Sequence, residues 1–284
     1  MPVIRWERWN VSRSDTYTII PIGDVHLGHV ACDERLLAAT VKRIAEDPTC
    51  YWVGLGDYCE YVNRSDKRYD PEQCADWVRA EPRGRIAQVQ TEHITQALKP
   101  IADRCLGLVE GNHERIVQQK YEWDPFYEIV KALKKEAGLG ADQRLGLGFT
   151  GWLDLRYYQA PEPKRAGLRR VLINLHHGFV GGRLAGAKAL NMQRRLWTTG
   201  CDLCLMGHSH NTDVFRQSVA ELDRGGRKVY PVRKGAFCGT FLGAPVDTVP
   251  YYEEQGYFPT PVGTIEIELR PGAHCVMERV RITA

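Results

Sequence analysis

Short apolar runs alternate with amphipathic segments through the first half of the chain. The runs Tyr17–Ile22, Cys50–Asp57 and Arg104–Val109 are short and largely apolar, which is typical of buried strands, and the first is rich in β-branched residues. Apolar residues between the runs recur at helical spacing, and Asp33 can cap the first helix. Helices are therefore predicted over residues 33–46, 84–98 and 124–136, with a short helix from residue 71 and an edge strand over residues 3–11.

The second half of the chain has a different pattern, in which strands predominate. One helix is predicted over residues 184–196, and strands over residues 149–158, 171–177, 201–206, 213–221, 228–233, 237–242, 263–269 and 274–282. The sequence contains no internal repeat, low-complexity segment or clear linker. We therefore expect one domain over residues 1–284, with a β-rich part from residue 211 onward.

Metal-competent side chains follow the ends of the predicted strands, and most of the nine histidines lie there. Strand ends in α/β sheets often converge on one site, and neighbouring glycines let the backbone turn sharply toward a ligand. Asp24 and His26 are two residues apart, and side chains at this spacing on an extended chain point to the same side of it. The strand ends are Gly23-Asp-Val-His26, Gly56-Asp-Tyr-Cys-Glu60, Gly111-Asn-His-Glu114, Leu175-His-His-Gly178 and Gly207-His-Ser-His210.

The residue types in these strand ends indicate which metal they would bind. Imidazole, carboxylate and amide oxygen together suit Mn, Fe, Zn, Co or Ni, whereas an all-oxygen set would suit Mg or Ca. The ligand groups are too many for one tetrahedral ion. With one bridging carboxylate, they suit two ions roughly 3.5–4 Å apart, and we expect manganese first.

The ordered set of motifs resembles the calcineurin-like metallophosphoesterase family. The resemblance spans Gly23 to His210. It implies an α/β fold, a four-layer α/β/β/α sandwich with two central mixed sheets and a dimetal site at their rim. It also implies metal-dependent hydrolysis of phosphate esters, in which a hydroxide bridging the ions attacks phosphorus.

The resemblance further implies a role for each motif residue. Asp57 would bridge the two ions. The first ion would be held by Asp24, His26 and His210, and the second by Asn112, His208 and either His176 or His177. Of this pair we prefer His176, because it directly follows the apolar strand. His177 remains an alternative ligand, because it immediately precedes a glycine, as the corresponding histidine does in other members.

His113 would be catalytic and not a metal ligand. Its counterpart in the family reaches the substrate, where it stabilises the transition state or protonates the leaving oxygen. Glu60 stands where many members carry Asp, at a position that in some members orients that histidine. Because Glu60 keeps the carboxylate, we expect it to keep the role.

The substrate is less well defined by the sequence. The net charge of +3 gives no strong argument for a large nucleic-acid footprint. We favour small or single-stranded phosphodiesters, such as nucleotides or single-stranded nucleic acid, over phosphomonoesters. The alternatives are a phosphomonoesterase, including a protein phosphatase, and a non-catalytic metal-binding scaffold.

Two further segments could contact a substrate. The glycine-rich stretch 178–188 could present Arg183 to a phosphate or form a tight turn. The tyrosines and phenylalanine of residues 251–258 could stack on bases or pack the loop onto the protein, and we favour packing. Nine scattered cysteines, with no signal-peptide core and no apolar run near the ~18 residues of a membrane span, favour a cytoplasmic protein without a membrane contact.

Overall fold

The structure is a computed structural model of the chain. It describes residues 2–67, 69–81, 84–162, 167, 169–179, 185–223, 225–243, 261–271 and 277–283.

One central sheet combines the early strands with the end of the chain. Its strand order is β13-β12-β2-β3-β4, in which β2, β3 and β4 are parallel and β12 is antiparallel to both of its neighbours. The strands are β2 (Tyr17–Ile22), β3 (Cys50–Gly54), β4 (Cys105–Leu108), β12 (Thr264–Leu269) and β13 (Met277–Thr283). The late strands therefore extend the sheet that the first strands began.

A second sheet has the order β1-β5-β6-β7-β11-β8. It is also mixed, because β5 and β6 are antiparallel, β6, β7 and β11 are parallel, and β8 is antiparallel to β11. Its strands are β1 (Val3–Arg8), β5 (Thr150–Tyr157), β6 (Arg169–His176), β7 (Leu203–Met206), β8 (Val214–Ser218) and β11 (Val232–Phe237), and β9 (Glu221–Leu222) pairs with β10 (Lys228–Val229) beside it.

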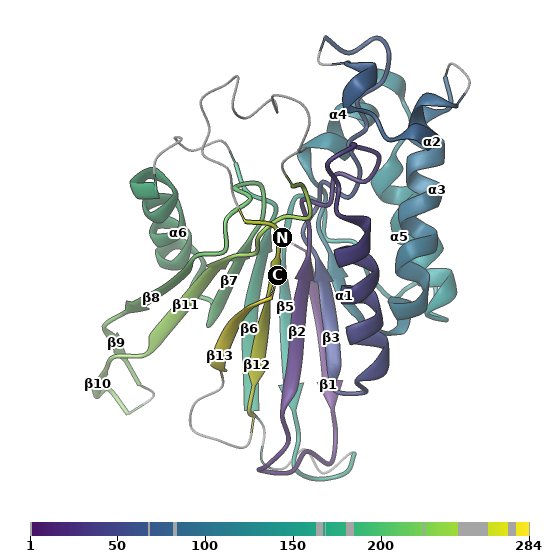
Figure 1. The fold of residues 1–284 in the computed structure, drawn as a ribbon. Helices are drawn as coiled ribbons and strands as arrows, with labels where there is room; N and C mark the ends of the chain where they lie inside the picture. Colours follow the sequence, from purple (N-terminus) through teal and green to yellow (C-terminus); the bar gives the residue numbers. More distant parts are fainter. Residues whose placement is uncertain are drawn as a thin grey trace.

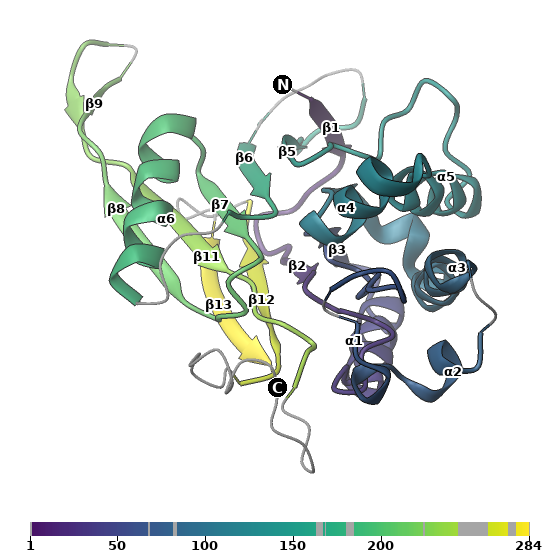
Figure 2. The ribbon, with the colours of Figure 1, turned by 90° about the horizontal axis from the view of Figure 1, so that it is seen from above.

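Helices cover the outer faces of the two sheets (Figure 1, Figure 2). Those beside the first sheet are α1 (Glu34–Glu46), α2 (Asp76–Arg79), α3 (Ile86–Leu98), α4 (Asn112–Tyr121) and α5 (Pro125–Glu136), with the 3-10 segments η1 (Pro71–Gln73) and η2 (Lys99–Arg104). The helix α6 (Ala185–Thr199) covers the second sheet. No helix of the described residues has the length and apolarity to cross a membrane.

Three hydrophobic clusters separate these layers. The inward faces of the two sheets meet in one cluster, which includes Ile19, Val53 and Ile173. A second cluster packs α1, α3 and α5 against the first sheet, and a third packs Met192 and Leu196 of α6 against the second sheet. The predicted four-layer α/β/β/α arrangement is therefore confirmed.

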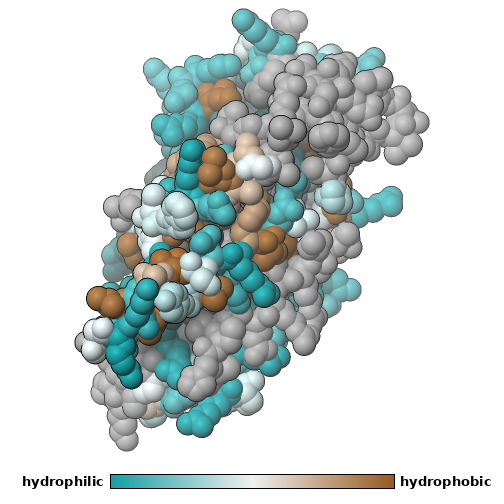
Figure 3. Space-filling view, turned by 90° about the vertical axis from the view of Figure 1, so that its left-hand side faces the viewer, coloured by the Kyte–Doolittle hydropathy of each residue, from teal (hydrophilic) through white to brown (hydrophobic). Residues whose placement is uncertain are grey.

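The outer side of the molecule near α6 and β8 carries apolar side chains without one continuous patch. Figure 3 faces this side and shows apolar residues interspersed with hydrophilic ones among those that are coloured. Leu190, Val214 and Val232 are each at least partly open to solvent. Scattered apolar residues of this kind are normal on a protein surface.

Most predicted elements are confirmed, with two informative exceptions. Asp33 caps α1 as expected, since its Oδ1 accepts the Leu36 N–H at 2.9 Å. The strand predicted over residues 237–242 is wrong, because β11 ends at Phe237 and the main-chain N–H groups of residues 239, 240 and 241 bond to Asn211, Gly263 and Asp24, which lie outside the strands. The helix α4 was missed, although it begins inside the Gly-Asn-His-Glu motif.

Candidate metal centre

The candidate residues follow strands whose carboxyl ends lie at a common edge. β2, β3 and β4 run parallel in one sheet, and β6 and β7 run parallel in the other. Asp24 and His26 follow β2, Asp57 follows β3, and Asn112 opens the helix after β4. His177 follows β6, and His208 and His210 follow β7. The fold thus brings together residues as far apart in the sequence as Asp24 and His210.

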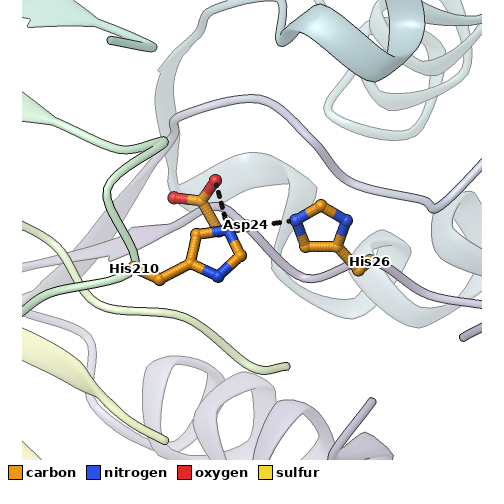
Figure 4. Close-up of side chains that lie close together, drawn as sticks. All are labelled: Asp24, His26 and His210. Atoms are coloured by element: carbon orange, nitrogen blue, oxygen red, sulfur yellow. Dashed lines mark hydrogen bonds and ion pairs between the residues drawn. The ribbon is translucent and has the colours of Figure 1, made fainter. Parts of the chain in front are cut away.

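Asp24, His26 and His210 form the first group of potential ligands. Figure 4 shows the three side chains close together, with dashed lines joining His210 to both others. The Nε2 atoms of His26 and His210 lie 3.3 Å apart, and His210 Nε2 lies 3.5 Å from Asp24 Oδ1. That buried carboxylate oxygen has no hydrogen-bond partner among the described residues. The group therefore presents acceptor atoms to a shared space.

Asp57, His177 and His208 form the second group, and Asn112 adjoins it. His177 Nε2 lies 3.2 Å from Asp57 Oδ2 and 2.9 Å from Asn112 Oδ1. His177 Nδ1 lies 2.6 Å from the Leu55 carbonyl oxygen. Because that oxygen can only accept, Nδ1 is the donor, and the lone pair of the neutral ring is left on Nε2, facing two other acceptors.

Of the two tandem histidines, His177 faces the candidate metal centre, contrary to our preference for His176. The ring of His176 lies between Phe149 and Phe179, and its Nδ1 accepts the Gly178 N–H at 2.7 Å. His177 instead reaches Asp57 and Asn112. Successive side chains of an extended chain point to opposite faces, so only one of two neighbours can face the site. β6 ends at His176, so the residue that directly follows the strand is His177 and not His176.

Many of these residues have a left-handed backbone, which non-glycine residues seldom adopt. The φ angles are 49° at Asp24, 50° at His26, 50° at Asp57, 64° at His208 and 56° at His210. Such residues cost of order 1–3 kcal/mol each and tend to cluster at functional sites. Asp24 and His26 therefore meet at one site because the chain curls after β2, and not because it stays extended, as their spacing had led us to expect.

Buried main-chain contacts hold the second group in place. Glu114, fully buried in α4, accepts the N–H groups of Asp57 at 2.9 Å, Tyr58 at 2.8 Å and Gly111 at 2.9 Å. The His113 N–H donates to Asp57 Oδ1 at 2.8 Å. A Cβ at Gly111 would lie 2.1 Å from the Asp57 nitrogen, so only glycine allows this approach. This role of Glu114 was not predicted from the sequence, although Gly111-x-x-Glu114 has capping-box spacing.

Lys188 of α6 holds the loop that carries His208 and His210. Its Nζ donates to the Ser209 carbonyl oxygen at 3.2 Å and also to Asn211 Oδ1. Burial lowers the pKa of this ammonium group. No local sequence pattern pointed to this contact, because the two segments meet only in the fold.

Glu60 contacts both His26 and His113, by different groups. Its Oε2 lies 2.7 Å from His26 Nδ1, whereas its main-chain carbonyl oxygen lies 2.5 Å from His113 Nδ1. The carboxylate is 3.9 Å from His113. The expectation that this carboxylate orients His113 therefore needs correction: it hydrogen-bonds His26, and the backbone of the same residue bonds His113.

The charges of the site fit cations. Burial alone would lower the pKa of His177, but Asp57 raises it to about 10. Burial would likewise lower the pKa of His26, but Glu60 and the two aspartates raise it to about 9. Converging lone pairs repel one another unless a positive charge lies between them, and a proton can take that place. The imidazole, carboxylate and amide donors equally suit a divalent transition-metal ion.

Two other sequence candidates, Arg183 and residues 251–258, lie outside the described residues.

Comparisons with known proteins gave matches among solved structures alone. No family model matches the sequence, and no curated protein matches it. Similar structures include Vps29 of Entamoeba histolytica complexed with Zn²⁺, which is 11% identical, with 94% of this chain and 98% of that chain covered and a TM-score of 0.40. A metallophosphoesterase from Sphaerobacter thermophilus is 14% identical, with coverages of 95% and 89% and a TM-score of 0.37.

A calcineurin-like phosphoesterase, YfkN from Bacillus subtilis, is 11% identical, with coverages of 95% and 90% and a TM-score of 0.35. Structures described as calcineurin-like phosphoesterases and metallophosphoesterases are thus among those similar to this chain. Because these TM-scores lie below 0.5, the function of the chain is inferred from its own side chains.

Proposed function

We propose that this chain is a metal-dependent phosphoesterase that hydrolyses phosphate esters, with small or single-stranded phosphodiesters preferred over phosphomonoesters. The observation that carries the proposal is the pair of neighbouring ligand groups where strand ends of the two sheets meet, with His113 beside them. The His113 ring lies edge-on to His26, with the ring centroids 4.8 Å apart. Metal ligands next to a histidine that can serve the substrate are the parts that phosphate-ester hydrolysis needs.

Two divalent ions would be shared among the groups already described. Asp24, His26 and His210 would hold one ion, and His177, His208 and Asn112 the other, with Asp57 contacting both. Manganese is our first choice, and Fe, Zn, Co and Ni suit the same ligands. Such ions would neutralise phosphate oxygens and make a bound water a better nucleophile.

The protein itself fixes the ligand atoms before a substrate arrives. The Leu55 carbonyl holds His177 so that Nε2 faces Asp57, and Glu60 holds His26 so that Nε2 faces His210. Partners of this kind set the tautomer and the orientation of a ligating imidazole. Preorganised ligands need no rearrangement during the reaction.

His113 would act as the general acid that protonates the leaving-group oxygen. Its Nδ1 donates to the Glu60 carbonyl, so Nε2 is the ring atom that can carry a second proton. In the protonated ring, Nε2 would give that proton to the leaving alkoxide, and the ring would return to its neutral tautomer. Its main-chain N–H bonds Asp57, which ties the position of His113 to the candidate bridging ligand.

The proposal also includes the binding partner and the cellular compartment of the protein. The partner would be a phosphate ester, with a nucleotide or single-stranded nucleic acid as the preferred class. We place the protein in the cytoplasm, because the described cysteines are all free thiols.

The test is hydrolysis of p-nitrophenyl phosphate and bis-p-nitrophenyl phosphate with Mn²⁺ added to chelator-treated protein. We expect metal-dependent turnover that is faster on the diester, and a loss in Asp57→Asn. The matched control is Asp33→Asn, which makes the same exchange at a helix cap that asparagine can also serve.

The outcomes separate the alternatives. Faster turnover of the monoester would make the chain a phosphomonoesterase. Metal binding without hydrolysis of either ester would refute the enzyme and leave the metal-binding scaffold.

A further inference from the structure

Aromatic side chains form a rim beside the second ligand group. We call Phe149, His176, Phe179 and the guanidinium of Arg115 the aromatic rim. The rings of Phe149 and His176 lie 5.6 Å apart, and those of His176 and Phe179 lie 5.7 Å apart, both edge-to-face. Arg115 of α4 lies over the Phe149 ring, 5.7 Å from its centroid. The rim thus runs from α4 to the segment that precedes α6.

The rim adjoins the candidate metal centre directly. Phe149 contacts the His177 ring as well as the His176 ring, with centroids 5.6 Å apart. Gly178 packs tightly against His208, since a Cβ at this glycine would lie 2.6 Å from the His208 Cβ. Phe179 is the next residue along the chain. A ligand whose phosphate lay at the second ligand group could therefore reach Phe179 with an attached ring.

Phe179 is exposed where a core phenylalanine would be buried. Its side chain is 47% exposed, and its one ring contact among the described residues is the edge-to-face contact with His176. An aromatic face open to solvent beside a ligand site can stack on a planar ring.

His176 adds a directional hydrogen-bond donor beside Phe179, at a residue that is itself only 8% exposed. Its Nδ1 accepts the Gly178 N–H at 2.7 Å, which places the hydrogen of the neutral ring on Nε2. No described residue accepts a hydrogen bond from this Nε2, and it is not among the fully enclosed unpaired atoms. His176, which contacts Phe149 and Phe179 and not the candidate ligands of the second group, is thus a neutral donor between two phenylalanines.

We propose that the aromatic rim binds the base of a nucleotide ester, with Phe179 stacking on the base and His176 donating to a base carbonyl or ring nitrogen. The proposal rests on the proposed function, because it places the phosphate of the same ester at the metal centre. It defines the substrate class as nucleotide phosphodiesters.

A base fits the rim better than a plain hydrocarbon group does. A hydrocarbon would leave the His176 N–H and the Arg115 guanidinium without partners on desolvation, which carries a penalty. A base offers both an aromatic face and polar edge atoms. Its stacking is tolerant of sequence, so the rim selects a nucleotide without selecting one particular base.

Two esters with the same leaving group test the rim. Thymidine 5′-(p-nitrophenyl phosphate) carries a base, and methyl p-nitrophenyl phosphate does not. Base–aromatic stacking contributes ~1–3 kcal/mol, which corresponds to about 5- to 150-fold. We expect Phe179→Ala to lower kcat/KM by that factor for the thymidine ester, mainly through KM, and to change the methyl ester less than about twofold.

Two control variants sharpen the comparison. Phe179→Leu keeps apolar area but loses the aromatic face, and we expect it to resemble the alanine variant on the thymidine ester. Tyr230→Ala removes another exposed aromatic side chain, beside β10, and should leave both esters unchanged. Full activity of Phe179→Leu would show simple apolar packing and would overturn the stacking proposal.

The failure of the rim can be told apart from the failure of the proposed function. If wild type hydrolyses both esters equally and Phe179→Ala changes neither, or changes both alike, the rim proposal is wrong and the phosphoesterase stands. If wild type hydrolyses neither ester with metal present, the proposed function is wrong and the rim proposal falls with it.

Discussion

Replacing Glu60 with alanine should weaken metal binding at the group of Asp24, His26 and His210. The Glu60 carboxylate accepts from His26 Nδ1 at 2.7 Å, and the His26 side chain is only 5% exposed. Without the carboxylate, the Nδ1 hydrogen has no described partner, and the other tautomer would place a hydrogen on Nε2, where the ion should bind.

The size of the effect depends on the kind of bond that is lost. Removing such a partner of a ligating histidine costs 10- to 100-fold in metal affinity, or about 1.4–2.8 kcal/mol. Burial alone would raise the pKa of Glu60, but His113 and His26 lower it to about 2, so the carboxylate is charged at neutral pH. Charge-assisted bonds are about twice as strong as neutral ones, so Glu60→Gln should lose only about 3- to 10-fold.

The assay is calorimetric titration of chelator-treated protein with Mn²⁺ at pH 7, with folding checked by circular dichroism. Glu110→Gln is the control. Glu110 is a partly buried carboxylate, and His177 is among the charged groups that affect its pKa. Among the described contacts it has no hydrogen bond to a candidate ligand. It removes the same charge near the site without removing an orienting contact. We expect its Mn²⁺ affinity to stay within about threefold of wild type.

Two results would refute this reasoning. Wild-type Mn²⁺ affinity in a folded Glu60→Ala protein would mean that His26 does not depend on the carboxylate. Equal losses in Glu60→Gln and Glu110→Gln would mean that general charge near the site matters, and not the bond to His26.

Three other predictions rest on the same geometry. His177→Ala should lose the second ion, whereas His176→Ala should keep both, as elemental analysis would show; the reverse would make His176 the ligand. His113→Ala should keep its metal but lose turnover by ~10²–10⁴-fold, with larger losses on alkyl than on p-nitrophenyl esters, and loss of metal would make it a ligand. In metal-free protein, the pKa of His177 is raised to about 10, so its contribution to stability is complete below its unfolded value near 6.5 and lost as pH rises toward 10. Urea unfolding should therefore show the difference between wild type and His177→Gln falling by about 1.4 kcal/mol per pH unit between pH 7.5 and 9, and a constant difference would contradict the contact with Asp57.

The candidate ligands, apart from the choice between His176 and His177, could be named from the sequence because the pattern that marks them is local. An apolar run predicts a strand wherever it lies, and the polar residues that follow Ile22 or Met206 must then stand at a strand end. Parallel strands of one sheet place such ends at a common edge, so the convergence of Asp24 with Asp57 could also be expected from the sequence, whereas His210 follows a strand of the other sheet. The helix that begins after Asp33 could equally be predicted, since both its cap and its apolar face are local patterns.

The direction of each side chain was decided by tertiary structure. Beyond a strand end, alternation no longer fixes which way a residue points, and the left-handed turns at Asp24 and His26 were not visible in the sequence. Whether His176 or His177 faces the site depended on where β6 ends and on the Leu55 carbonyl, 122 residues away, which bonds the His177 ring.

The partners of the site residues were likewise set by contacts that are distant in sequence. Glu60 could have oriented either His26 or His113, because both lie within reach of its side chain. Glu114 fixes the turn at Asp57 from 57 residues away, and Lys188 fixes the loop of Ser209. A sequence specifies which donors and acceptors exist, but their pairing depends on distances that arise only when the two sheets pack against each other.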